Sequence, residues 1–386
     1  MSYDLSIYGT TRIGPSDVAD LVQLAPNLTP TDSGTDESGA GMVRVHRGAP
    51  QGPGFTIDGP FGVEDEDIPV EVTARILGVR WLYRISVEDV SDKTMGDANK
   101  ISRKLTKTVD GILVDEQTGQ LWPKSNQRQP PRPKVAELVD EIELKWCYKV
   151  DDAPHDLAAR YLRLARKYLP EALPRRYGSS EPFQGNLERD GDAHFIRSLD
   201  VEATITTYMV GKYPVTSGSL VGRKKFPGNT RFISLSVDRG TFSDPLWREA
   251  LMKFFNAVAV ELVCFFASGE VLRPGRSAHG ATFFQMHEEG YYPADYRGQW
   301  YGLPAYPIWW SWYAKPYAEL VHQYLPGARQ NPDGSLFHSW QEDSADRDQL
   351  SLLLPHPDLP WIPAELSQLQ GEPVQRAAVI PAEYAD

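Results

Sequence analysis

The chain has 386 residues, of which 41% are hydrophobic and 24% are charged. That composition is ordinary for a globular protein, and the length predicts about two or three domains. The only two cysteines, Cys147 and Cys264, form no disulfide framework, which favours a reducing compartment. No stretch approaches the roughly 18 apolar residues of a membrane-spanning helix. The first residues lack the features of a signal peptide, so we expect a cytoplasmic protein with no membrane partner.

Acidic residues outnumber basic residues by 52 to 40, which gives a net charge of -12. Nucleic-acid binding depends on lysine and arginine side chains that neutralise phosphates, so this balance argues against a nucleic-acid partner. Acidity often serves solubility alone. A sharper interpretation is that acidic residues, including the Glu64 to Asp67 run, steer a basic protein partner into place.

Residues 1–124 are expected to form an α+β domain. Alternating apolar residues predict a strand over 2–8, and a helical apolar period predicts helices over 16–23 and 97–109. Abundant Thr, Asp, Ser and Gly predict a loop over 28–41. Further strands are expected over residues 41–46, 54–58, 80–88, 112–114 and 120–122. This order predicts two helices packed on one face of an antiparallel sheet.

A proline-rich stretch without periodicity predicts a linker over residues 125–140. A second α+β domain is expected over residues 141–340. It begins with a strand over 141–150, whose apolar residues alternate with polar ones. A helix is expected after Pro154, and further strands over 201–210 and 231–238.

The segment from Asp244 to about Ser268 is predicted to be the central buried helix, because its sequence is apolar on nearly all sides. Its expected core residues are Phe254, Val258, Leu262 and Phe265. Both domains repeat the order strand, helix, two strands, helix, which indicates split βαβ-like α+β units. The two domains repeat only the order of their helices and strands, and their residues are not identical. Residues 341–386 are expected to form an acidic tail interrupted by prolines.

Sequence motifs for common chemistries are missing. The chain has neither a Gly-Lys-Ser/Thr phosphate-binding loop nor a Gly-x-Ser-x-Gly nucleophile turn. His287-Glu288-Glu289 resembles the start of a zinc-protease helix, but Tyr291 occupies the position of its second histidine. Both cysteines lie in apolar runs, where thiols are inert. We therefore predict no catalytic residue, no metal site and no cofactor.

Residues 291–317 contain eleven aromatic residues and form the most unusual segment of the chain. They could complete a core, form a protein interface or line a small-ligand pocket. Since one short helix cannot turn all of them inward, we expect at least one tryptophan of this segment to be exposed. The predicted binding residues are Arg297, Trp300, Tyr301, Trp309, Trp310, Trp312 and Tyr317.

Short motifs in the second half resemble one known family. The motifs are Leu173-Pro174-Arg175-Arg176-Tyr177-Gly178 with Glu181-Pro182, then Trp300-Tyr301-Gly302-Leu303-Pro304, Trp309 or Trp310, and Lys315-Pro316-Tyr317-Ala318-Glu319-Leu320-Val321. Over roughly residues 141–325, this layout resembles immunity proteins of bacterial polymorphic toxin systems. The resemblance implies a cytoplasmic α+β protein that neutralises a cognate toxin by binding it, with no catalytic residues. Residues 1–124 lie outside the resemblance.

The residues thus favour a protein-binding module, and two alternatives stay open. A hydrolase or transferase would have a deep pocket of His279, His287, Glu288 and Arg297, lined by the aromatic segment. A structural subunit of an assembly would have a large self-complementary surface. A broad apolar patch on the surface would instead favour the binding of another protein.

Overall fold

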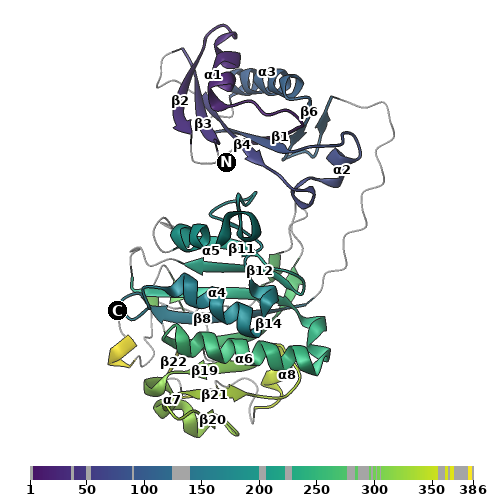
Figure 1. Cartoon of the computed structure of the whole chain (residues 1–386). Helices are drawn as coiled ribbons and strands as arrows, with labels where there is room; N and C mark the ends of the chain where they lie inside the picture. Colours follow the sequence, from purple (N-terminus) through teal and green to yellow (C-terminus); the bar gives the residue numbers. More distant parts are fainter. Residues whose placement is uncertain are drawn as a thin grey trace. The chain divides into compact units, whose positions relative to one another are not determined.

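The chain divides into two compact units, unit 1 (Met1–Ala136) and unit 2 (Glu137–Asp386), both drawn in Figure 1. Each unit is an α+β structure on one large antiparallel sheet, which confirms the predicted fold class. The computed structural model describes residues 3–35, 39–48, 54–88, 91–123, 140–199, 206–221, 228–275, 283–285, 295–296, 299–300, 302–304, 306–354, 361–363, 366–368 and 381–384. The predicted linker lies almost wholly outside these residues.

The sheet of unit 1 has the strand order β2-β3-β4-β5-β1-β6-β7. Its strands are β1 (Tyr3–Gly9), β2 (Leu28–Thr35), β3 (Gly41–Arg47), β4 (Gly54–Gly62), β5 (Trp81–Val87), β6 (Gly111–Asp115) and β7 (Leu121–Trp122). Its helices are α1 (Pro15–Gln23), α2 (Val70–Thr73) and α3 (Asp92–Thr108), with a 3-10 turn η1 (Asp65–Asp67).

The central strand of unit 1 is β1, which pairs with β5 on one side and β6 on the other. Both neighbours are antiparallel to β1, so β5 and β6 run parallel to each other, and α3 connects them. Helix α1 likewise connects β1 to β2, with three strands between those two in the sheet. These are split βαβ connections, as the sequence predicts.

Two apolar clusters lie on opposite faces of the unit 1 sheet. Ile7 of β1 packs with Val22 of α1 and Leu105 of α3, so these helices share one face, as predicted. On the other face, Tyr8 of β1 belongs to a smaller cluster that includes Val72 of α2. Helix α2, which the sequence patterns did not predict, covers the second face, because this end of that face is also apolar and must be covered.

The main sheet of unit 2 has the strand order β10-β9-β11-β12-β13-β8-β14-β19-β21-β20, and β15 pairs with β14. The strands are β8 (Glu141–Lys149), β9 (Arg176–Gly178), β10 (Gly185–Asn186), β11 (Thr206–Val210), β12 (Val215–Val221), β13 (Thr230–Asp238), β14 (Cys264–Gly275), β15 (Phe283–Gln285), β16 (Asp295–Tyr296), β17 (Gln299–Trp300), β18 (Leu303–Pro304), β19 (Trp310–Tyr313), β20 (Arg329–Gln330), β21 (Leu336–Ser339) and β22 (Ser367–Gln368). The helices are α4 (Leu157–Tyr168), α5 (Leu187–Arg197), α6 (Pro245–Glu261), α7 (Lys315–Val321) and α8 (Arg347–Ser351), with 3-10 turns η2 (Pro170–Ala172), η4 (Arg239–Ser243), η5 (His322–Tyr324) and η6 (Ala382–Tyr384).

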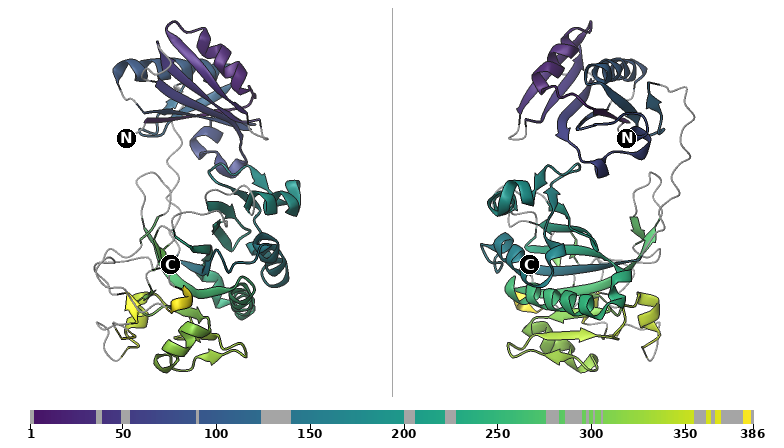
Figure 2. Two further views of the ribbon diagram at one scale, coloured as in Figure 1. Left: turned by 90° about the vertical axis from the view of Figure 1, so that its left-hand side faces the viewer. Right: turned by 45° about the vertical axis from the view of Figure 1, so that its right-hand side comes forward.

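Different parts of the chain cover the two faces of the unit 2 sheet (Figure 2). On one face, Trp146 of β8 packs with residues of α4 and α6. On the other face, Phe266 of β14 packs with Tyr317 of α7, and with Ile362 and Tyr384 from the last part of the chain. The two predicted helices, α4 and α6, thus share one face, and α7, which the sequence patterns did not predict, covers the other. Within the predicted tail, residues 341–386, described residues join this second core.

The two units have the same topology. In each, the first strand (β1 or β8) becomes the centre of the sheet, and a 17-residue helix (α3 or α6) connects the two strands that flank it. A first helix (α1 or α4) leads in each unit to the distant strand (β2 or β9), from which the chain returns strand by strand to the centre. Unit 2 adds β10 and α5 within this plan, and β19, β21 and β20 extend its sheet beyond β14. A repeat of pattern is thus present, but each unit has more than the two predicted strands between these helices.

The two 17-residue helices also end in the same way. Each has a fully buried aliphatic residue at its C-cap, Val109 or Leu262. The next residue has a positive φ, 47° at Asp110 and 54° at Val263, and the following residue begins the next strand. Aligning the helices at these ends pairs Lys93 with Leu246, Lys104 with Ala257, and Lys107 with Val260.

Two predicted elements are corrected by the structure. Residues 28–35 form strand β2 at the sheet edge, because Thr and even Pro30 are tolerated on an edge strand. The predicted helix from Asp244 to Ser268 ends at Glu261, and Cys264 begins β14. An apolar run without periodicity does not distinguish a buried helix from a strand buried on both faces. The predicted core residues of that segment are nevertheless confirmed as buried, at Phe254, Val258, Leu262 and Phe265.

We expect Val263→Gly to raise the free energy of unfolding by about 0.5–1 kcal/mol. A β-branched residue at positive φ is strained, glycine is not, and the Val263 side chain is 51% exposed, so little packing is lost. The control is Val260→Gly, an exposed position three residues earlier with helical backbone, which should lower that free energy by up to about 1 kcal/mol. Chemical denaturation measures both, and destabilisation by both variants would contradict the assignment.

Candidate interaction surface

Most of the described residues of the aromatic segment lie in the core of unit 2. The Trp300 ring packs edge-on against Phe265, with 4.9 Å between ring centroids. Its indole Nε1 donates a hydrogen bond to the Tyr317 hydroxyl at 2.6 Å. Tyr384, near the end of the chain, stacks on the Tyr317 ring. Trp300 and Tyr317 are both buried, so the free protein presents neither to a partner.

The other three tryptophans of the segment are buried as well. Trp309 and Trp310 stack with 4.3 Å between centroids, and Phe242 packs edge-on against Trp309. Trp312 lies on β19, between β14 and β21, and is 3% exposed. The expectation of an exposed tryptophan is therefore wrong. A strand covered on both faces can bury successive aromatic residues on alternate sides, which a short helix cannot do.

Several predicted site residues lie outside the described residues. These are Arg297 and Tyr301 of the predicted binding set, and His279, His287 and Glu288 of the alternative enzyme pocket. Their arrangement is therefore not described, and the predicted pocket stays a prediction.

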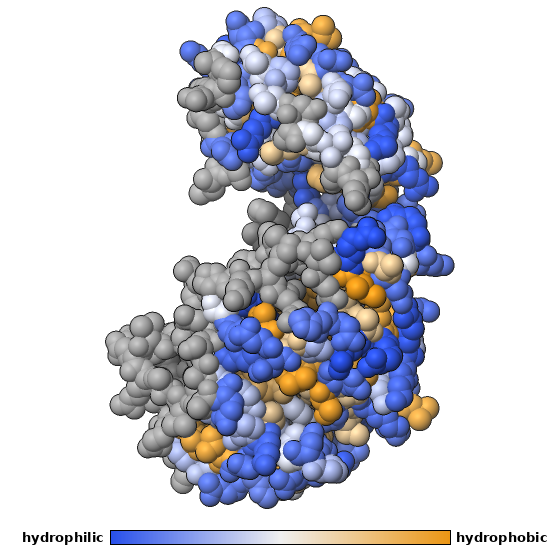
Figure 3. Space-filling view, turned by 60° about the vertical axis from the view of Figure 1, so that its left-hand side comes forward, coloured by the Kyte–Doolittle hydropathy of each residue, from blue (hydrophilic) through white to orange (hydrophobic). Residues whose placement is uncertain are grey.

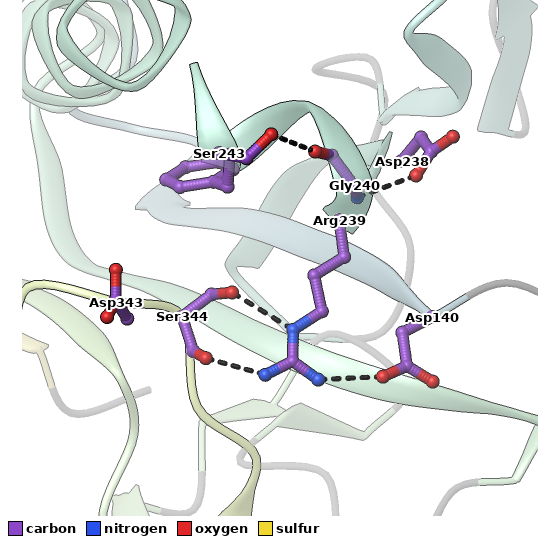
Figure 4. Close-up of a pocket in the computed structure, with 8 residues that line it drawn as sticks. Asp140, Asp238, Arg239, Gly240, Ser243, Asp343 and Ser344 are labelled. Carbon is purple, nitrogen blue, oxygen red and sulfur yellow. Dashed lines mark hydrogen bonds and ion pairs between the residues drawn. The ribbon is translucent and has the colours of Figure 1, made fainter. Parts of the chain in front are cut away.

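A shallow polar pocket of about 650 Å³ surrounds Arg239, at the start of η4 (Figure 4). Nη1 of Arg239 donates to Asp140 at 2.7 Å, while Nη2 and Nε donate to the carbonyl oxygen and Oγ of Ser344 at 2.6 and 3.0 Å. The Ser243 hydroxyl donates to the Gly240 carbonyl at 2.9 Å. The Arg239 guanidinium and the Ser243 hydroxyl proton are thus both engaged in structural hydrogen bonds.

A second arginine fixes the same part of the chain. Arg347, on α8, donates from Nη2 to Glu270 of β14 at 3.1 Å, with both side chains nearly buried. Its guanidinium also lies against the Tyr306 ring. Together, Arg239 and Arg347 tie residues 344–347 to strands at the centre of the sheet. Both arginines therefore have a structural role in this arrangement.

An open apolar groove lies between α4 and α6, with a cavity volume of about 690 Å³. Figure 1 shows the two helices side by side over the sheet, where they pack against each other. The floor of the groove is formed by the apolar parts of Leu164, Tyr168, Met252, Ala257 and Val260. The loop 331–333 lines one side of it.

The apolar surface of α6 extends beyond the groove. Val260 is 48% exposed, and Leu246 in the first turn of α6 is 77% exposed. Figure 3 shows hydrophobic residues set among hydrophilic ones on the surface of unit 2. An apolar groove bordered by charged residues is a candidate binding site for another molecule. The groove between α4 and α6 is accordingly the candidate interaction surface.

The rim of the groove is charged. Arg163 of α4 pairs with Glu261 at 2.9 Å, and Lys253 of α6 pairs with Glu249 at 2.7 Å. Lys167 lies 4.7 Å from the centroid of the Tyr168 ring. All four paired side chains are more than 40% exposed, so solvent screens their ion pairs and each contributes little stability.

The remaining described residues offer few chemical groups for catalysis. They contain no cluster of three or more His, Cys, Asp or Glu side chains that could hold a metal ion. Cys147 and Cys264 are both buried, and burial raises the pKa of the Cys264 thiol well above its ordinary value. That thiol is therefore protonated and unreactive at neutral pH. Within the described part of the chain, no helix is long and apolar enough to span a bilayer.

Comparison with known proteins leaves the family open. No protein-family model matches the chain, and no curated protein matches it. Among solved structures, the Pseudomonas aeruginosa T6SS protein PA0821 aligns at 12% identity over 63% of this chain and 80% of its own, with a TM-score of 0.38. A protein described as a glycine cleavage system transcriptional repressor aligns at 15% identity over 71% and 99%, with a TM-score of 0.19. Scores this low carry no argument about fold or function.

The sequence contained a signal for the groove that was interpreted differently. The nearly all-round apolar character of α6 predicts a helix that is buried on every side. A helix that covers a sheet always turns one side away from it, so an all-round apolar helix in this position must expose apolar residues. The cations of α4 at positions 163 and 167 then mark the other wall of the groove.

His338 provides a pH-sensitive group in the same unit. It lies on β21, is 1% exposed, and packs edge-on against Trp340 with 4.9 Å between centroids. Burial lowers the pKa of His338 from 6.5 to about 4. The folded state thus binds fewer protons than the unfolded state between those pH values, so protonation favours unfolding there.

We expect the free energy of unfolding to fall as the pH is lowered from 6.5 towards 4. The two pKa values differ by the equivalent of about 3 kcal/mol, which is the full contribution of His338. In the variant His338→Gln, the side chain at this position does not titrate in this range. The free energy of unfolding of the variant should therefore change less between pH 6.5 and 4, whatever its value at pH 7. Denaturation midpoints across the range measure the slope, and equal slopes in both proteins would refute the assignment.

Proposed function

We propose that the protein acts by binding another protein, and that it is an immunity protein which neutralises a toxin by occupying it. The observation that carries the proposal is the apolar groove on the helix layer of unit 2. A folded protein gains nothing from apolar side chains left in water, so a groove of this kind favours a binding partner.

The comparison between the two units strengthens this argument. Helix α3 of unit 1 has the same length and position in the topology as α6, but its outer side carries the exposed cations Lys93, Lys104 and Lys107. The equivalent positions in α6 are Leu246, Ala257 and Val260. Because the same topology folds with lysines at these positions, folding does not require the apolar residues of α6. A function in binding supplies the reason for them.

The residues that carry the resemblance to immunity proteins have a structural role in this chain. Arg176 and Tyr177 are buried, and Arg176 donates from Nη2 to the Phe183 carbonyl at 2.6 Å. The Lys315 to Val321 motif forms α7, whose Tyr317 and Val321 are fully buried. The resemblance therefore supports a shared scaffold, and the contact residues must be sought on the surface.

We expect the double variant Ala257→Gln/Val260→Gln to abolish binding of the partner without unfolding the protein. Glutamine fills the groove with polar atoms, while long polar side chains at the equivalent positions of α3 show that the fold accepts them. The partner is identified by co-purification from the native host, and the product of a neighbouring gene is the first candidate. Affinity should fall at least about tenfold.

The control is Leu24→Gln, which changes an exposed apolar residue of unit 1 and should leave the affinity unchanged. Co-expression with the candidate toxin provides a second measurement, in which the wild-type protein and the control protect the cells and the groove variant does not. Equal protection by all three proteins would refute the groove as the binding site.

A further inference from the structure

Helix α4 is unusually basic for this protein. It carries Arg160, Arg163, Arg166 and Lys167 and no acidic residue, in a chain of net charge -12. Its apolar residues, including Tyr161 and Leu164, are buried against the sheet and α6. The cations therefore lie on the outer side of the helix layer. Arg160 and Arg163 pair there with Glu261, and Arg166 pairs with Asp192.

The cations at the groove are available to a ligand. Arg163 and Lys253 make only exposed ion pairs, which a partner carboxylate can replace at little loss. Lys167 has no ion pair among the described residues and contacts the ring of Tyr168. The groove lining holds three cations, Arg163, Lys167 and Lys253, and two carboxylates, Glu261 and Asp333.

The size of the groove limits what can occupy it. Its floor along α6 runs from Met252 to Val260, which at 1.5 Å per residue is about 12 Å. That length matches about two turns of a helix. Because the floor lies between two packed helices, the side chains of a third helix can enter it as ridges enter grooves in ordinary helix packing.

We propose that the groove binds a short amphipathic helix of the partner protein, with an apolar face flanked by Asp and Glu. Apolar side chains of this helix cover Met252, Ala257 and Val260, and its carboxylates lie near Lys167 and Lys253. A basic helix would place like charges together at the rim, which disfavours it. This inference rests on the proposed function and adds the chemistry of the partner segment.

The test uses the purified full-length chain and a displayed library of helical peptides, with the positions around a fixed apolar stripe randomised. We expect the selected peptides to be rich in Asp and Glu beside the stripe. Ala257→Gln/Val260→Gln should abolish their binding. The charge-reversal variant Lys167→Glu/Lys253→Glu should weaken it at least about tenfold, and added salt should weaken binding to the wild-type chain.

The matched control is Lys93→Glu/Lys315→Glu, which changes the net charge equally at exposed lysines of α3 and α7 and should leave peptide affinity unchanged. An equal loss in this control would mean that net charge alone governs binding, and would overturn the inference.

Two other outcomes separate the inference from the proposed function. Selection of basic or uncharged peptides that still depend on Ala257 and Val260 would overturn the acidic partner and leave the groove as a protein-binding site. Selected peptides that bind equally well to the Ala257→Gln/Val260→Gln variant would overturn the helix-in-groove proposal. The proposed function would then depend on whether the co-purified partner requires the groove.

Discussion

The position of α6 on β8 determines most of what unit 2 presents to solvent. Trp146 of the central strand donates from Nε1 to the Phe255 carbonyl of α6 at 2.9 Å, inside a fully buried contact. The Trp146 ring also packs edge-on against Phe254. This hydrogen bond and the packing around it fix which side of α6 faces the sheet. The opposite side, with Val260 and Leu246, must then face outward, and α4 beside it completes the groove.

The sequence predicted the fold well where its patterns were regular. The alternation of Ile142, Leu144, Trp146 and Tyr148 indicated β8, and the structure places that strand at the centre of its sheet. The end of α6 could not be predicted in the same way. Val263 is β-branched and thus a poor residue for positive φ, so nothing in the sequence marks the turn between α6 and β14. Burial of β14 on both faces removed the alternation that identifies a strand.

The candidate site was harder to predict than the fold, because exposure depends on strand pairing between distant residues. Trp310 and Trp312 are buried since β19 pairs with β14 on one side and β21 on the other, and no local pattern announces that pairing. The abundance of aromatic residues was therefore a signal of a large core. The groove, in contrast, depends on the local composition of two helices. The apolar residues of α6 and the cations of α4 can be read in the sequence, but they indicate a groove only once the orientation of α6 is known.

The repeated topology turns unit 1 into an internal reference for unit 2. Both units solve the same packing problem with a central strand, two flanking strands and a 17-residue helix that connects them. Residues required by that topology should agree in chemical type, and the buried C-cap residues Val109 and Leu262 do agree. Outer positions 107 and 260 hold lysine in one unit and valine in the other, so the topology does not determine them. The valine at 260 is thus free of a requirement from the shared topology, which is what the proposed contact with a partner protein needs.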